Sequence, residues 1–129
     1  MHIYWRRKYY YMNELERNIN LIKEIANYCD EITEARKIFG DSYETLINNN
    51  HYRNDVSMCI LQIGELSNRL TEKFKKKYDK IAWRDIKDMR NIAAHDYKKL
   101  KYKILWKTIS EDIPELCEYC DKIIVEYEN

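Results

Sequence analysis

The sequence has few residues that interrupt a helix and no long apolar run. Its 129 residues include two glycines and one proline, so most of the chain can be helical. No apolar run approaches the roughly 20 residues that a membrane-spanning helix needs. The first residues are basic, but tyrosines follow where a signal peptide has its apolar segment. These absences predict a cytoplasmic, all-α protein with no membrane partner.

An excess of charge of one sign is also lacking, because 23 basic and 22 acidic residues give a net charge of +1. Any surface for nucleic acid must therefore be local. The chain has four cysteines, Cys29, Cys59, Cys117 and Cys120. In a helical chain without a signal peptide we expect reduced thiols rather than disulfides. Cys117 and Cys120 have the spacing of a metal or redox pair, but no second pair accompanies them. They fit the inner face of a helix better, and we expect neither a metal nor a cofactor.

Apolar residues recur at three- and four-residue steps over most of the chain, which predicts amphipathic helices. Residues 1–11 differ, because aromatic and basic residues follow no period there. We expect either a loosely held extension or an arm that docks on a neighbouring subunit. Residues 12–129 are expected to form one domain, an up-and-down bundle of four to five helices. The expected helices cover residues 13–39, 43–47, 52–70, 71–78 (a short helix or turn), 83–96 and, after a basic connection over 98–103, about 102–127.

Gly64 lies inside the helix expected over residues 52–70. A glycine in a helix interior costs about 1 kcal/mol relative to alanine. A close crossing with another helix or a nearby ligand would explain a glycine at this position.

The segment from Trp83 to Tyr97 is the part of the chain whose residues can carry out chemistry. On a regular helix successive residues are about 100° apart. Arg90 then lies at the border of the core-facing side, and Tyr97 falls on nearly the same side. His95 is rotated by about 140° from Arg90. The two side chains can meet if the helix loosens near His95, or if a second copy of the helix supplies the partner group at a two-fold interface.

An arginine and a histidine together suit the cleavage of a phosphodiester without a metal. Arg90 offers a fork of donors that matches phosphate oxygens. His95 can exchange protons near neutral pH, as a base on a ribose 2′-hydroxyl or as an acid at the leaving oxygen. This chemistry needs the 2′-hydroxyl and so favours RNA. The alternative is structural, a salt bridge and a contact with the helix C-terminus.

The wider pattern around this segment resembles the HEPN superfamily, and within it the HepT-like toxins. The matching residues are Ile63-Gly64-Glu65, Trp83-x-x-Ile86-x-x-Met89-Arg90-Asn91-x-x-x-His95-Asp96-Tyr97, Trp106, and Ile113-Pro114-x-Leu116. The resemblance covers the chain from about Met12 to Ile124.

The resemblance implies a helical-bundle ribonuclease that acts on RNA as a homodimer or a higher oligomer. Arg90 and His95 become the catalytic pair, with one motif from each protomer in a shared cleft. Asn91 matches a polar position after the arginine. Tyr97 matches the residue to which an MNT-type nucleotidyltransferase antitoxin adds AMP, which silences the toxin. Phosphates added at Tyr97 could occupy Arg90 and block the cleft.

Other residues have a supporting or an open role. Glu65 is expected to orient Arg90 if it points inward, and otherwise to be a surface charge. Lys98, Lys99 and Lys101 are either solvated or contacts for the RNA backbone. The preferred hypothesis is a metal-independent endoribonuclease of a type VII-like toxin–antitoxin pair. The alternatives are a non-catalytic HEPN module that binds nucleotide, RNA or a partner nucleotidyltransferase, and a purely structural subunit of that complex.

Overall fold

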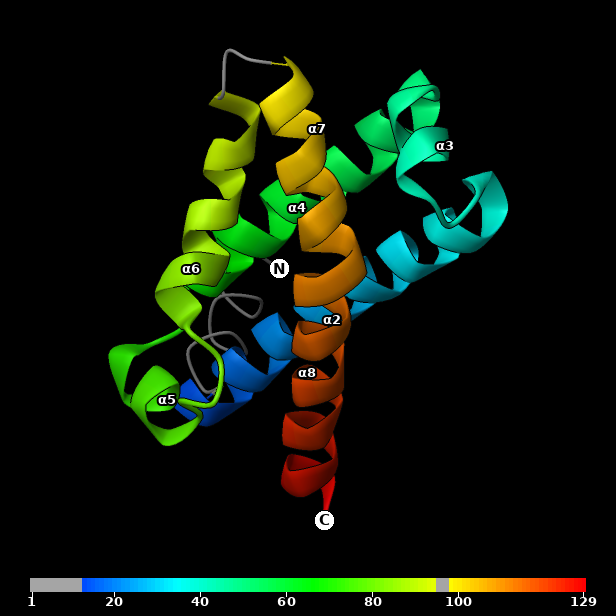
Figure 1. Cartoon of the computed structure of the whole chain (residues 1–129). Coiled ribbons are helices and arrows are strands. Elements are labelled where there is room, and N and C mark those ends of the chain that lie inside the picture. Colours follow the sequence, from blue (N-terminus) through cyan, green and yellow to red (C-terminus); the bar gives the residue numbers. More distant parts are fainter. Residues whose placement is uncertain (1–12, 95–97) are drawn as a thin grey trace, which may run out of the picture.

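The computed structural model describes residues 13–94 and 98–129, without the side chains of residues 92–94 and 98–100. The prediction for residues 1–11 lies outside the described residues. The described chain is helical and contains no strand (Figure 1), so the all-α prediction is confirmed. None of the described helices combines the length and the apolar character needed to cross a membrane.

The first described helix, α2 (Glu14–Phe39), begins and ends as the sequence predicts. Oδ1 of Asn13 accepts a hydrogen bond from the backbone N–H of Glu16 at 2.8 Å, which satisfies one of the free donors of the first turn. The helix ends at Gly40, whose φ of 119° is a conformation that residues with a Cβ rarely adopt.

Three helices follow, and each begins after a side-chain cap. They are α3 (Tyr43–Ile47), α4 (Asn50–Asn68) and α5 (Glu72–Lys77). The caps are Ser42, Asn49 and Thr71, whose side-chain oxygens each accept from the backbone N–H three residues on. Local side-chain chemistry thus sets these helix starts.

The core lies where α2 packs against α4 and against α8 (Ile113–Glu128). These helices cross in Figure 1, and α2 runs behind the long C-terminal column. The apolar stripes predicted from the sequence meet here, and Ile22, Ile63 and Leu116 are completely buried. Burying such side chains is the main favourable contribution to folding.

The C-terminal column is one continuous helical stretch of α7 (Lys98–Lys107), the π-helical turn η2 (Thr108–Asp112) and α8 (Figure 1). The basic connection predicted over residues 98–103 is wrong, because these residues form the first turns of α7. Lysine, leucine and tyrosine can all continue a helix, and the buried Leu105 anchors this one. Pro114 starts α8 near its first position, one of the two roles predicted for it.

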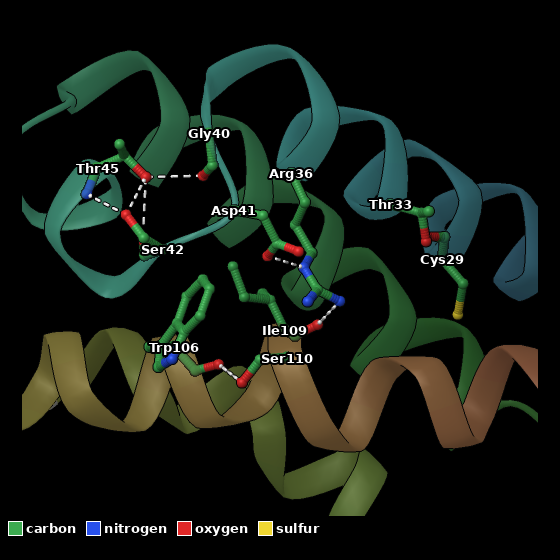
Figure 2. Close-up of polar contacts among 10 residues, drawn as sticks. All are labelled: Cys29, Thr33, Arg36, Gly40, Asp41, Ser42, Thr45, Trp106, Ile109 and Ser110. Atoms are coloured by element: carbon green, nitrogen blue, oxygen red, sulfur yellow. Dashed lines mark hydrogen bonds and ion pairs between the residues drawn. The ribbon is translucent and has the colours of Figure 1, made fainter.

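The π-helical turn has a local cause. In η2 the N–H of Ile113 bonds to the carbonyl of Thr108, five residues back. The next residue, Pro114, has no N–H, so it leaves the carbonyl of Ile109 without its helical donor. Nη1 of Arg36 donates to that carbonyl at 3.2 Å (Figure 2). An arginine of α2 thus completes the backbone hydrogen bonding of the column.

Candidate functional site

The segment predicted to carry the chemistry is not a regular α-helix throughout. It consists of α6 (Trp83–Asp88) and the 3₁₀-helical segment η1 (Met89–Ala94), so the helix predicted over residues 83–96 is corrected. Nε1 of the buried Trp83 donates to the carbonyl of Tyr78 at 2.6 Å and fixes the start of α6. Helix ends often tighten to 3₁₀ geometry, because this pairs some of the free carbonyls. Angles of 100° per residue do not apply from Met89 on.

Gly64 marks the point where α4 crosses this segment at close range. A Cβ built on Gly64 would lie 3.2 Å from Cβ of Arg90 and 3.3 Å from the carbonyl oxygen of Lys87. The absence of a side chain therefore allows the two backbones to approach each other. Of the two explanations offered by the sequence, the close helix crossing is the observed one, and it lies directly under Arg90.

Arg90 is held at the surface by an ion pair. Its Nη1 lies 2.9 Å from Oε1 of Glu65, the residue that follows Gly64 on α4. The side chains of Arg90 and Glu65 are 32% and 54% exposed. Such a half-exposed pair contributes at most about 1 kcal/mol to stability. It does, however, orient the guanidinium, and among the described residues no other side chain pairs with Arg90. Glu65 is therefore an exposed residue rather than an inward one, and it contacts Arg90 from the surface.

A groove of about 270 Å³ opens beside Arg90, between α4, η1 and α7. Its apolar lining includes two exposed side chains of α4, Met58 and Leu61. Polar residues also line it, and among them Lys101 of α7 brings a second positive charge next to Arg90. The described residues that line the groove are Asn54, Ser57, Met58, Ile60, Leu61, Met89, Arg90, Lys101 and Leu105. The combination suits an anionic ligand with a flat apolar part.

The remaining predicted site residues are placed only in part. Asn91 lies in η1 and is exposed. Lys98 and Lys99 belong to the first turn of α7, but their side chains lie outside the described part. His95 and Tyr97 lie outside the described residues altogether, so their predicted relation to Arg90 stays a prediction.

A cluster of possible metal ligands joins α2 and α4 at a place that the sequence reasoning missed. One ligand atom from each of Glu31, Asp55 and Cys59 lies within 4.8 Å of the others. Burial and the neighbouring carboxylate of Glu31 raise the pKa of the Cys59 thiol. The protonated thiol donates to Glu31, so the cluster satisfies itself by hydrogen bonding. Only the i, i+4 spacing of Asp55 and Cys59 on α4 could have signalled it.

The pair Cys117 and Cys120 lies on α8 as predicted, and the two thiols differ in their surroundings. Cys120 is fully buried, and its burial raises its pKa to about 12. Cys117 is partly buried; its Sγ lies 3.5 Å from Oδ1 of Asp30, and its pKa is raised to about 11 by burial and this contact. Thiols with such raised pKa values are protonated at neutral pH and are therefore weak nucleophiles. Their observed role is packing between α2 and α8.

Over most of its length the chain is similar to a ribonuclease family and to proteins that are named as ribonucleases. The family model described as Ribonuclease HepT-like matches residues 15–123. The relative named Putative RNase MJ1380, of Methanocaldococcus jannaschii, is 34% identical over 93 residues, which are 72% of this chain and 84% of the relative. Putative RNase MJ0125 of the same organism is 30% identical over 105 residues, 81% of this chain and 89% of the relative.

A relative from another organism carries the family name itself. Probable ribonuclease HepT of Thermococcus cleftensis is 30% identical over 95 residues, which are 70% of this chain and 86% of the relative. No solved structure matches the chain significantly.

Proposed function

This chain belongs to the HepT-like ribonuclease family, and from that premise we propose that it is a metal-independent RNA endonuclease in which Arg90 and His95 act together. The observation that carries the proposal is the setting of Arg90. The close crossing at Gly64 and the ion pair with Glu65 hold a guanidinium at the rim of an open groove. A positively charged, pre-oriented fork of donors is what a phosphodiester needs.

In the proposed reaction the neutral imidazole of His95 removes the proton of a ribose 2′-hydroxyl. The 2′-oxygen attacks the adjacent phosphorus, and the bond from phosphorus to the 5′-oxygen breaks. The 5′-oxygen leaves with a proton donated by the protonated His95 of the second protomer, so the products are a 2′,3′-cyclic phosphate and a 5′-hydroxyl, and the first His95 keeps the proton that it removed until it exchanges with water. Arg90 stabilises the charge that develops on the phosphoryl oxygens. Glu65 keeps the guanidinium in place, and Asn91 and the lysines of α7 contact the neighbouring RNA.

The proposal includes assembly and regulation. Two copies place their Arg90 and His95 motifs in one cleft, which makes the enzyme a homodimer or a higher oligomer. The protein is a cytoplasmic toxin of a type VII-like pair. An MNT-type nucleotidyltransferase antitoxin silences it by adding AMP to Tyr97. The added phosphates would compete with RNA for Arg90, whose guanidinium is only partly engaged by Glu65.

A non-catalytic binding module is the second candidate, and one observation favours it. The Glu65 carboxylate already neutralises part of the charge of Arg90, so an incoming phosphate must compete with it. Such a module would bind RNA or nucleotide through the same groove without turnover.

The test is cleavage of a mixed RNA pool by the full chain in the presence of a chelator. We expect products with cyclic phosphate ends from the parent protein. With His95→Ala we expect a loss of at least about 100-fold, the size typical of a lost general acid or base, with an unchanged melting temperature. Cleavage by His95→Ala at the parent rate would contradict the mechanism, and RNA binding without products would favour the module.

The regulatory half has its own test, which is the intact mass of the protein after co-expression with a nucleotidyltransferase encoded beside it. We expect one or more AMP increments on a peptide that contains Tyr97, and none with Tyr97→Phe. AMP increments that persist in Tyr97→Phe would show that another residue is modified. Their absence from the parent protein would remove the antitoxin from the proposal.

A further inference from the structure

We propose that the groove between α4 and α7 binds one unstacked nucleobase of the RNA, next to the phosphate held by Arg90. The inference rests on the proposed ribonuclease function and assigns to the same site a pocket that determines base preference. Arg90 belongs to both, because its side chain also lines the groove.

The floor of the groove is apolar and partly open to solvent. Met58 and Leu61 of α4 are 57% and 43% exposed, whereas the neighbouring Met89 is buried. Flexible thioether side chains make favourable contacts with aromatic rings, and stacking on a base accepts any π-face. An unstacked base would cover these exposed side chains without a change in the protein core.

Two polar side chains of α4 are available to read the edge of a base. Asn54 and Ser57 line the groove, and their spacing of three residues places them on one face of the helix. Among the described residues neither side chain has a hydrogen bond. An asparagine amide offers a donor and an acceptor side by side, which match the N6 amino group and N7 of adenine. We therefore expect adenine to be preferred.

The positive charges at the groove favour a nucleotide, rather than a second copy of the protein, as its occupant. Lys101 is half-buried beside the groove and forms no ion pair within the described residues. A protein surface that covered the groove with apolar side chains would leave this ammonium group buried and unpaired, which is costly. A nucleotide supplies an anion for Lys101 and Arg90 together with a flat ring for the floor. The volume of about 270 Å³ also fits a single base.

Binding is tested by NMR of the full chain labelled with ¹³C at the methionine methyl groups. Met58→Ala and Met89→Leu assign the two groove signals. Adenosine monophosphate should move both signals upfield by the ring current of the base, and inorganic phosphate should not. Signals that stay in place with all four nucleoside monophosphates, or that phosphate moves equally, would overturn the proposal. So would signals that change only with protein concentration, because a second copy would then cover the groove.

Base preference is tested by mapping the cleavage sites of the parent and of Asn54→Ala in a randomised RNA. We expect Asn54→Ala to lower the preference for adenine at one position beside the cut by about tenfold, the value of one good base contact. The matched control is Asn68→Ala, an exposed asparagine at the end of the same helix and outside the groove. An unchanged profile in Asn54→Ala contradicts the inference alone. A parent protein that cuts no RNA contradicts the ribonuclease function, and the methyl signals still decide whether a base binds.

Discussion

In the described part of the chain, two helical segments depart from α-helical geometry, and an arginine lies at each of them. At the π-helical turn η2, Arg36 donates to the carbonyl of Ile109, pairs with Asp41 at 2.8 Å and lies 5.8 Å from the centre of the Trp106 ring (Figure 2). At the 3₁₀-helical segment η1, Arg90 pairs with one side chain of the described residues, Glu65, at 2.9 Å.

The difference shows that an irregular helix is not by itself a sign of function. The π-helical turn follows from Pro114, and Arg36 compensates for it by satisfying the backbone. Three contacts leave Arg36 little freedom to bind anything else. Within the part of the chain that the structure describes, the Arg90 side chain bonds to no backbone group, and it faces a groove. The candidate site at η1 therefore differs from η2 in the partners of its arginine and not in the irregularity of the helix.

The largest expected effect concerns the two arginines themselves. Arg90→Ala should lower RNA cleavage by at least about 100-fold, the loss seen when one charge-stabilising group is removed from an active site. Its unfolding free energy should change by no more than about 1 kcal/mol, because the ion pair is half-exposed. Cleavage kinetics and urea unfolding measure the two quantities. An Arg90→Ala protein that cleaves normally would remove Arg90 from the reaction.

Arg36→Ala should give the opposite result. The substitution leaves the carbonyl of Ile109 without a donor and Asp41 without its partner, so we expect a loss of about 2 kcal/mol in unfolding free energy. Arg36 has no part in the proposed reaction, so the cleavage rate per folded molecule should stay within about twofold of the parent. A twofold change in rate corresponds to less than about 0.5 kcal/mol in activation free energy. Urea unfolding and cleavage below the unfolding transition measure this. A variant that keeps its stability and loses cleavage would make the two regions functionally alike.

The two glycines next to these arginines give a smaller effect. Gly40 has positive φ, and an added Cβ would lie 2.8 Å from Cγ2 of Thr45, so Gly40→Ala should cost about 1–3 kcal/mol. In Gly64→Ala the higher helix propensity of alanine offsets about 1 kcal/mol of crowding. Its stability should change little, but displacement of Arg90 should slow cleavage by about threefold to tenfold. Thermal unfolding and cleavage rates of both variants check this, and a fully active Gly64→Ala would show that the crossing does not position Arg90.

The acidic partners should give the smallest effect. Glu65→Gln and Asp41→Asn remove carboxylates that are 54% and 57% exposed, so each should change stability by at most about 1 kcal/mol. Glu65→Gln alone should alter cleavage by a few-fold and change its dependence on salt, because the charge of Arg90 is no longer shared. Rates measured from low to high salt test this. Equal salt profiles for the two variants would leave Glu65 without a positioning role.

Much of the fold could be read from the sequence. The cap at Asn13, the stop at Gly40 and the short helix Tyr43–Ile47 lie where local chemistry predicts them. The Pro114 position also follows from local rules. The start of α7 was missed, because a run of lysines resembles a solvated connection as much as an exposed helical face.

The candidate site could be predicted from the sequence only in part. Arg90 and Glu65 could be selected from the motif, but the groove beside Arg90 could not be. Its lining comes from α4, η1 and α7, which are distant in sequence, and residues such as Asn54 and Ser57 carry no motif. Likewise, Glu31 lies on a different helix from Asp55 and Cys59.

The sequence by itself determined where most helices begin and end, which faces are apolar, and that Arg90 is the candidate site arginine, because caps, periodicity, glycine and the motif around Arg90 are all local in the chain. Only the tertiary structure decided that Gly64 packs against Arg90 and that Glu65 pairs with Arg90. It also decided that Arg36 donates to a backbone carbonyl of η2. These relations depend on how helices cross, and crossings are set by the packing of side chains that are far apart in the chain.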